Sequence, residues 1–229
     1  KEVEFSEGLT VIADLSFSGC ESLQSISIPS TVQELGISAF VDCSSLSNID
    51  VSADNPFYDS RNNCNAIIET SSNKVIIGCS STIIPENVSS IGAYAFKGSG
   101  IESLTIPTSV TNIEINNYII ESTPFSGCRE LPSIVVADNN PVYDSRDKCN
   151  AIIHTSSNKL VAGCTSTHIP ADVETVGQYA FLEIENLKEI EFPEGLKTIE
   201  YLSFCKSGLS GNVAFPSTVE TIDDCAFLD

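Results

Sequence analysis

Residues 23–46 read LQSISIPSTVQELGISAFVDCSSL, and this stretch decides the fold. The alternating Ile-Ser-Ile indicates a half-buried strand, and Pro29 ends it because proline cannot donate the next ladder hydrogen bond. After the proline, apolar residues at a spacing of three point inward and a glycine supplies a tight bend. Ala39-Phe40 is then typical of a short helical or 3-10 turn anchored by one ring. Each copy of this pattern therefore contributes one short strand.

The same pattern recurs along the chain at a spacing of 22 to 23 residues, and segment 1–12 closely matches segment 188–199. Further copies are marked by an apolar residue followed by proline: Ile84-Pro85, Ile106-Pro107, Ile169-Pro170, Phe192-Pro193 and Phe215-Pro216. One unit cannot bury its own apolar side, so neighbouring units must stack. Stacking predicts a parallel ladder with strands about 4.8 Å apart, and an open face that curvature turns into a groove.

The unit IPxxVxxIGxxAFxxCxxL resembles the leucine-rich repeat of the BspA type, and the resemblance covers nearly the whole chain. It implies an α/β repeat fold: a leucine-rich repeat solenoid with short parallel strands, short helical or 3-10 turns, and two inserted β-hairpins. It also implies an extracellular or cell-surface, non-catalytic protein concerned with adhesion or partner binding. We expect residues 1–229 to form a single solenoid within a longer array, irregular at 114–122, where extra residues replace the usual bend.

Two inserts, at about 52–83 and 137–168, interrupt the cycle and are copies of one another displaced by 85 positions. Each contains two β-prone runs joined by Ser-Ser-Asn, as in CNAIIETSSNKVIIGC at 64–79, and this pattern predicts a β-hairpin. Such a hairpin places Cys64 nearly opposite Cys79, and Cys149 nearly opposite Cys164. The two pairs are either disulfides, which favour an exported protein, or buried free thiols that serve as small core residues.

Three residues recur in both inserts: Tyr58, Asp59 and Arg61 in the first, and Tyr143, Asp144 and Arg146 in the second. One interpretation is a duplicated recognition patch, because an aromatic ring beside a guanidinium suits protein interfaces. The other is that Asp-Ser-Arg caps the turn into the hairpin while the tyrosine packs beneath it. We favour the second, because an insert copied with its whole scaffold must also copy its fasteners. Calcium at Asp59 or Asp144 is disfavoured, since the several oxygen ligands of a calcium loop are not found nearby in the sequence.

Charge and composition exclude several partners. The 229 residues include 31 acidic and 11 basic side chains, for a formal net charge of −20, which repels nucleic acid and anionic lipid. We expect neither a membrane span nor a signal peptide, since there is no run of 18 apolar residues and no basic start followed by an apolar segment. The nine cysteines and two histidines form no zinc pattern, so no metal or cofactor is expected.

The sequence also carries no recognised catalytic arrangement, and we expect the protein not to be an enzyme. His154 and His168 occupy positions where the first insert has other residues, so neither belongs to a repeated site. Cys20, Cys43 and Cys128 each follow a repeat phenylalanine by three, in a slot that holds serine or isoleucine in other units. That exchange indicates a small interior slot, not a nucleophile.

The open strand positions are small, hydroxylated and acidic: Glu2, Glu4, Ser25, Ser27, Asn48, Asp50, Ser103, Thr105, Ser133, Val135, Glu189, Glu191, Asn212 and Ala214. They lack the aromatic and arginine anchors of tight interfaces, so a solvated sheet face is the simpler interpretation. If the face binds a partner, charge favours a basic protein from the host, the matrix or another cell surface. The sequence thus predicts a protein-binding or adhesion segment, with a passive spacer as the alternative, and leaves the ligand and the oligomeric state open.

Overall fold

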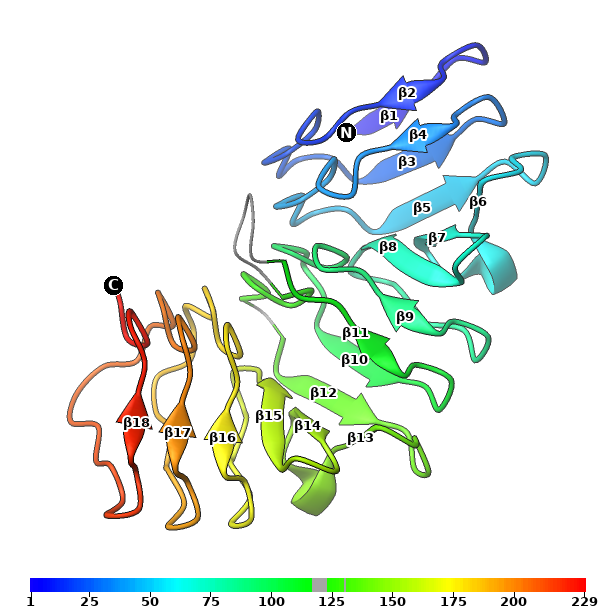
Figure 1. Cartoon of the computed structure of the whole chain (residues 1–229). Coiled ribbons are helices and arrows are strands. Elements are labelled where there is room, and N and C mark those ends of the chain that lie inside the picture. Colours follow the sequence, from blue (N-terminus) through cyan, green and yellow to red (C-terminus); the bar gives the residue numbers. More distant parts are fainter. Residues whose placement is uncertain (117–122, 130) are drawn as a thin grey trace.

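The computed structural model describes residues 1–116, 123–129 and 131–229, and it forms a curved stack of coils that runs from one terminus to the other (Figure 1). Each regular coil passes through a first-row strand, an outer loop that contains the proline, a second-row strand and an inner turn. The first-row strands are β1 (Glu2–Glu4), β3 (Ser25–Ile28), β5 (Asn48–Val51), β10 (Ser103–Ile106) and β12 (Ser133–Val136). The second-row strands are β2 (Val11–Ile12), β4 (Glu34–Leu35), β9 (Ser90–Ile91), β11 (Asn112–Ile113), β16 (Thr175–Val176), β17 (Thr198–Ile199) and β18 (Thr221–Ile222).

The first row confirms the predicted parallel ladder. Sheet β1-β3-β5 and pair β10-β12 are parallel and in register, so that Ile26 lies beside Ile49 and Leu104 beside Ile134. Alternate positions are buried because side chains along a strand point to opposite faces. The prediction is wrong at the C-terminal end, where residues 187–197 and 207–220 contain no strand, so the positions Glu189, Glu191, Asn212 and Ala214 lie outside any sheet.

The second row was missed, because the sequence predicted one strand per unit and the regular coils have two. The aliphatic residue that ends each second-row strand pairs with its equivalent in the next coil, as Ile12 does with Leu35 and Val176 with Ile199. These strands are two residues long, too short to show any alternation of polar and apolar residues in the sequence.

The inner turns, each centred on a repeat phenylalanine, follow the second-row strands. They are short turns and do not continue as helices, because the residue two positions after the phenylalanine has a positive φ, as at Gly19, Asp42 and Gly98. Neighbouring rings stack, with centroids 5.1 Å apart for Phe17 and Phe40 and 4.8 Å apart for Phe181 and Phe204. The phenylalanines therefore occupy equivalent positions in successive coils, as the stacked repeat requires.

The two inserts contain the predicted hairpins, and also the two short 3-10 helices of the described chain. The first insert holds β6 (Tyr58–Asp59), η1 (Arg61–Asn63), β7 (Ala66–Glu69) and β8 (Lys74–Gly78). The second holds β13 (Tyr143–Asp144), η2 (Arg146–Lys148), β14 (Ile152–His154) and β15 (Lys159–Ala162). Each hairpin joins the second row, because β8 pairs in parallel with β9 and β15 with β16.

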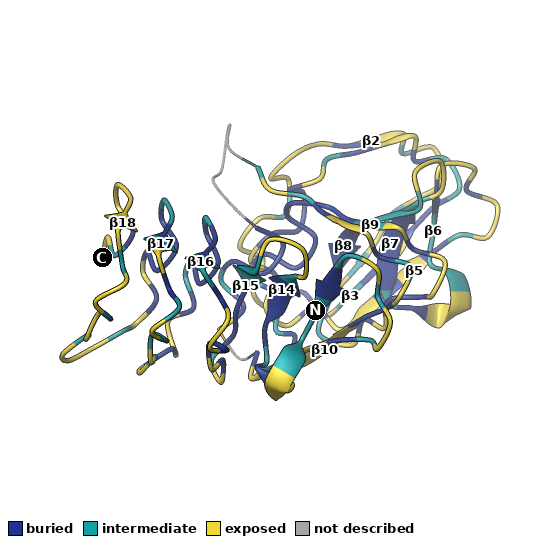
Figure 2. Cartoon of the chain, turned by 60° about the horizontal axis from the view of Figure 1, so that its bottom comes forward, coloured by how far each residue is buried: buried dark blue, intermediate teal, exposed yellow. Residues whose placement is uncertain are grey.

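The hairpins are internal partitions buried on both faces (Figure 2). Along β7, the side chains of Ala66 and Ile68 pack into the middle core, while that of Ile67 packs into the N-terminal core. In the second hairpin, Ile152 faces the middle core and Ile153 the C-terminal core. The run Ala-Ile-Ile is apolar on both sides for this reason, and the two hairpins separate the three largest cores of the described residues.

The same inserts explain the curvature. A coil that carries an insert returns from β8 to the first row through a tight turn at residues 79–82 and forms no inner turn. The inner turns on either side therefore meet directly, with Asp42 N donating to Lys97 O (3.0 Å) and Gly127 N to Leu182 O (3.1 Å). The inner side of the arc is shorter than the outer side, and the two strand rows form its flanks (Figure 1). The expectation that curvature hollows the strand face is thus wrong. Residues 117–122, within the segment expected to be irregular, lie outside the described residues.

Candidate functional site

The first-row face over β1, β3 and β5 is hollowed, and the first insert supplies one wall. The hollow has a volume of about 490 Å³ and lies over the outward positions of the three strands: Glu2, Ser25, Ser27, Asn48 and Asp50. The wall comes from Ser60, Asn63 and Asn65 around η1. Two hydrogen bonds fix it to β5, from Ile49 N to Asn65 Oδ1 (3.4 Å) and from Ser60 Oγ to Ile49 O (3.3 Å). The insert therefore converts a flat sheet face into a groove closed at one end.

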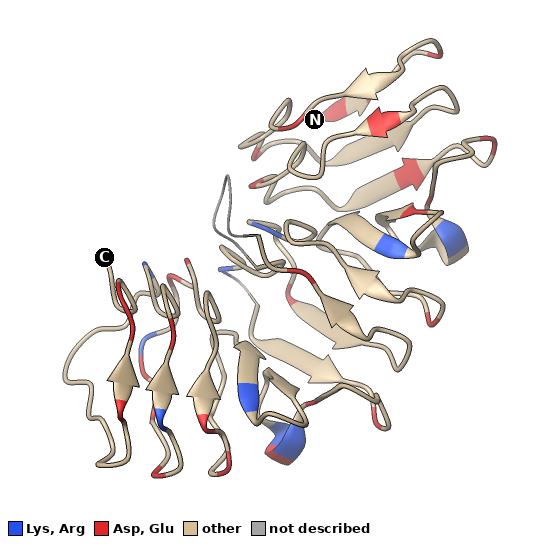
Figure 3. Cartoon of the chain, viewed as in Figure 1, with Lys and Arg blue, Asp and Glu red and all other residues tan. Residues whose placement is uncertain are grey.

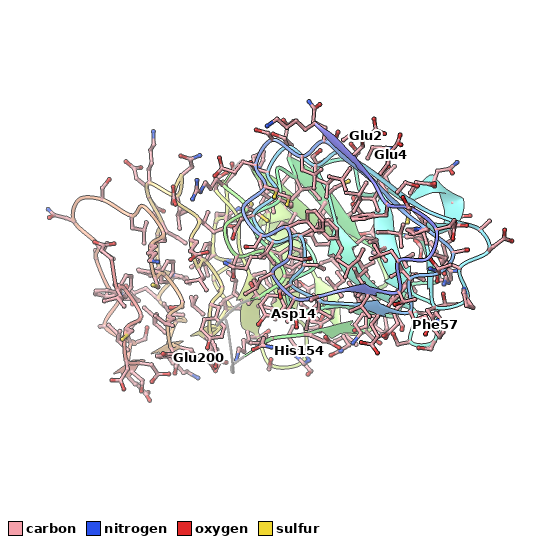
Figure 4. All side chains as sticks on the ribbon, turned by 90° about the horizontal axis from the view of Figure 1, so that it is seen from above. Glu2, Glu4, Asp14, Phe57, His154 and Glu200 are labelled. Atoms are coloured by element: carbon pink, nitrogen blue, oxygen red, sulfur yellow. The ribbon has the colours of Figure 1, made fainter. Side chains whose placement is uncertain are left out.

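This face is acidic only in its N-terminal part. Glu2, Glu4 and Asp50 are exposed and project from the strands, and Figure 4 shows the two glutamates on one side of the stack. The corresponding outward positions of β10 and β12 carry no charge: Ser103, Thr105, Ser133 and Val135. Many of the cations lie in the inserts instead, on η1, η2, β8 and β15 (Figure 3). The described strand face can therefore attract a basic group over β1, β3 and β5.

The duplicated tyrosines are fasteners, in agreement with the favoured interpretation. Tyr58 and Tyr143 are 7% and 6% exposed, which leaves little of either ring for a partner. The Tyr58 hydroxyl accepts a hydrogen bond from Leu35 N (3.1 Å), and the Tyr143 hydroxyl accepts one from Ile113 N (3.2 Å). Each hydroxyl thus satisfies the last strand N–H where the second row is interrupted by an insert. Burial raises the pKa of both phenols.

The arginine and aspartate of each insert lock its turn to the tip of its hairpin. Asp59 Oδ1 accepts from Arg61 N (3.0 Å) and Arg61 Nε (2.7 Å), while Arg61 Nη1 donates to Asn73 Oδ1 (2.9 Å). The second insert repeats this network with Asp144 and Arg146. Partial burial alone would raise the pKa of Asp59, but its hydrogen bonds with Arg61 outweigh burial and lower it.

Sequence reasoning missed the asparagine that opens each insert. Asn55 is buried, and its Nδ2 donates to Pro29 O (2.9 Å) and Val32 O (3.0 Å) of the preceding outer loop. Its Oδ1 accepts from Phe57 N and Tyr58 N, both at 2.9 Å. Asn140 makes the equivalent four bonds in the second insert. The sequence signal that could have identified this asparagine is its position as the first residue of the duplicated segment, at 55 and again at 140.

A second missed feature is a pair of lysines that reach across one coil. Lys74 Nζ donates to Glu114 Oε1 (3.0 Å), and Lys159 Nζ donates to Glu200 Oε1 (2.9 Å). Each lysine passes over the glycine of the intervening coil, and a Cβ at Gly177 would lie 2.8 Å from Cε of Lys159. The glycine therefore leaves space for the lysine, besides forming the bend.

All nine cysteines are free thiols in the structure. Cys64 packs into the middle core and Cys79 into the N-terminal core, so the two side chains lie on different sides of the hairpin, and Cys164 and Cys149 are likewise divided. The interior slot is confirmed for two of its three cysteines. Cys43 and Cys128 are buried, and burial raises the pKa of their thiols to about 11 and about 12. Cys20, in the first coil, is exposed.

Within the described residues, no group of three or more His, Cys, Asp or Glu side chains is placed to hold a metal ion. His154 stacks edge-on against Tyr143, with ring centroids 5.8 Å apart, and His168 lies near the end of the second insert. Among the helices of the described chain, none has the length and apolar character to cross a membrane.

Comparisons with known proteins agree with this architecture. A family model for the BspA type leucine rich repeat region matches six copies, over residues 1–118, 66–139 and 151–229. A leucine-rich repeat protein from Eubacterium ventriosum is 18% identical with a TM-score of 0.54, and the similarity covers 99% of this chain and 64% of that one. The pneumococcal vaccine antigen PcpA is 19% identical with a TM-score of 0.54, over 96% of this chain and 49% of that one. This chain thus spans about half to two thirds of their length, and at this identity the likeness concerns the fold. A comparison with curated proteins gives no match.

Proposed function

Because the chain belongs to the BspA-type leucine-rich repeat family, we propose that it is a non-catalytic, cell-surface or secreted segment that binds a basic protein partner. The partner class is a host, matrix or other cell-surface protein. The observation that carries the proposal is the acidic groove over β1, β3 and β5, whose end wall the first insert builds from polar side chains. A net charge of −20 steers a basic partner toward such a groove at long range.

The groove suits an extended basic segment. Its floor presents carboxylates from Glu2 and Asp50 and the hydroxyls of Ser25 and Ser27, which can accept hydrogen bonds from lysine or arginine. Its wall adds the amides of Asn63 and Asn65, which can bond a partner's main chain. The absence of aromatic anchors among these residues predicts modest affinity with a strong dependence on salt.

A charge-reversal experiment tests the proposal. The variant Glu2→Lys, Glu4→Lys, Asp50→Lys should lose most salt-sensitive attachment to host cells and to immobilised matrix proteins. The matched control Asp54→Lys, Asp138→Lys, Glu220→Lys makes the same change in net charge at exposed positions away from this face. Equal attachment by both variants would show that overall charge, not the groove, governs binding.

The alternative is a passive spacer that holds another module away from the cell surface. It is favoured by the small, solvated side chains on the strand face between β10 and β12, which offer no anchor. If the chain is a spacer, neither variant should change attachment. Exchanging this segment for an unrelated repeat stack of equal length should also leave the function of the parent chain intact.

A further inference from the structure

The concave side of the arc carries a second groove, which is distinct from the strand face. It has a volume of about 730 Å³ and is lined by inner turns from coils throughout the stack. A hydrogen-bond ladder orders these turns, with Gly19 N donating to Val41 O (3.0 Å) and Gly98 N to Ser126 O (2.9 Å). Most of the lining residues come from two repeat positions, two and four places after the repeat phenylalanine.

The centre of the groove is lined by glycines, and close packing against the preceding coil excludes side chains at two of them. A Cβ added to Gly98 would lie 2.1 Å from Asp42 Oδ1, and one added to Gly100 would lie 2.2 Å from Ser44 O. Gly127 continues the floor on the next turn. Neither Gly98 nor Gly100 can acquire a side chain without moving the preceding coil, so the main chain of a ligand can approach the floor closely here.

One end of the groove is acidic and available for binding. Glu21 and Asp42 line it from the first two inner turns, and both are exposed. The carboxylate of Asp42 accepts no hydrogen bond from any residue that the structure describes. Loss of surrounding water raises the pKa of Asp42, and the nearby Lys97 opposes this shift. An incoming cation would therefore find a carboxylate without a competing partner.

The other end carries a cation that is only loosely paired. Lys97 is 6% exposed and holds Glu183 tightly, with Nζ 2.6 Å from Oε2. Lys206 lies 3.9 Å from the other oxygen of the same carboxylate and is 61% exposed. Since Glu183 is already paired with Lys97, Lys206 can turn toward an incoming carboxylate at little cost.

We propose that the inner groove binds an extended, dipolar peptide segment of a protein partner, with a lysine or arginine on Asp42 and Glu21 and a carboxylate on Lys206. The segment's main chain lies over Gly98, Gly100 and Gly127. This site goes beyond the proposed function, which uses the strand face and requires only a basic partner. Opposite charges at its two ends give the inner groove a polarity that a purely basic ligand does not match.

Amide chemical shifts of the whole chain test the site with synthetic probes. The probes are capped Gly-Ser peptides with two lysines at one end and two glutamates at the other, made in both orders and with spacers of several lengths. Matched peptides replace either the lysines or the glutamates by glutamine. We expect a dipolar peptide to shift the amides of Gly98, Gly100 and Gly127, and both matched peptides to bind more weakly.

Variants assign the contacts. Asp42→Asn keeps a residue that tolerates the left-handed conformation at φ +59° and should weaken binding about tenfold, as expected for one charge-assisted hydrogen bond. Lys206→Gln should weaken binding of the dipolar peptide but not binding of the peptide that keeps only its lysines. Glu4→Gln, on the strand face, should change the binding of neither peptide.

Absence of shifts in the glycine amides for every dipolar probe would overturn the proposal, as would shifts that Asp42→Asn leaves unchanged. Shifts confined to β1, β3 and β5 would also overturn it while supporting the strand-face function. Conversely, failure of the charge-reversal experiment on the strand face would leave a positive result at these glycines intact.

Discussion

Replacing Tyr58 by phenylalanine tests how the inserts are fastened to the stack. The change removes one hydroxyl and leaves the N–H of Leu35 without its acceptor at 3.1 Å. Leu35 is 8% exposed, so water cannot readily take the place of the hydroxyl. A buried donor left unsatisfied costs about 1–3 kcal/mol, and we expect a loss of about 2 kcal/mol. Tyr143→Phe should cost the same at Ile113, and the two effects should add because the sites are far apart and share no partner.

Amide hydrogen exchange, followed by NMR, measures the effect at the amide of Leu35, and urea denaturation measures the loss of overall stability. A loss of about 2 kcal/mol corresponds to about thirtyfold faster exchange at Leu35 when exchange follows local opening. The amide of Ile113 serves as the internal control and should not change in Tyr58→Phe. Unchanged exchange at Leu35, together with an unchanged urea midpoint, would refute the idea that the hydroxyl completes the second strand row.

Three further predictions concern the core and the titrating groups. Gly78→Ala would place a Cβ 2.2 Å from a ring carbon of the next coil and should lower the free energy of unfolding by more than about 1 kcal/mol. The control Gly19→Asn, at an exposed site where an added Cβ meets no atom within 4 Å, introduces a residue that tolerates the positive φ and should cost less. Asp59 has a lowered pKa, so its stabilising contribution is present above the ordinary carboxyl pKa of about 4 and is lost as the pH falls below it; Asp59→Asn should flatten the acid limb of stability against pH. Thiol titration of the native protein at neutral pH should find two fast-reacting cysteines, Cys20 and Cys225, and full reactivity only after unfolding.

The repeat architecture could be predicted because its signals are local and periodic. Alternation in Ser25–Ile28 fixes the inward face of β3, and the proline that follows fixes the end of the strand. The recurring phenylalanine predicts the stacked rings, as for Phe17 and Phe40. The hairpins were predictable from two β-prone runs around a turn.

Other features depended on neighbours that one segment cannot reveal. KEIEF at 188–192 alternates as KEVEF does at 1–5, yet only the N-terminal copy forms a strand. The coil before the later copy is diverted by the second insert, and the coil after it, residues 207–220, contains no strand, so the later copy has no first-row partner on either side. Strand β10 follows the equivalent diversion at the first insert but pairs with β12. The inner groove depends on curvature, and curvature follows from turns that the inserts omit. Its charges, such as Lys206, are unremarkable in the sequence until the coils are stacked.

The hairpin partitions have a mechanical consequence. A force applied to either end of the chain would act in turn on the three largest cores. A hairpin separates each core from the next, and its two faces pack into different cores. The coils on one side of a hairpin can unfold while the core on its other side stays covered by that hairpin. We therefore expect the chain to unfold in steps under tension, and not in a single event; a pulling experiment with one unfolding event would contradict this expectation.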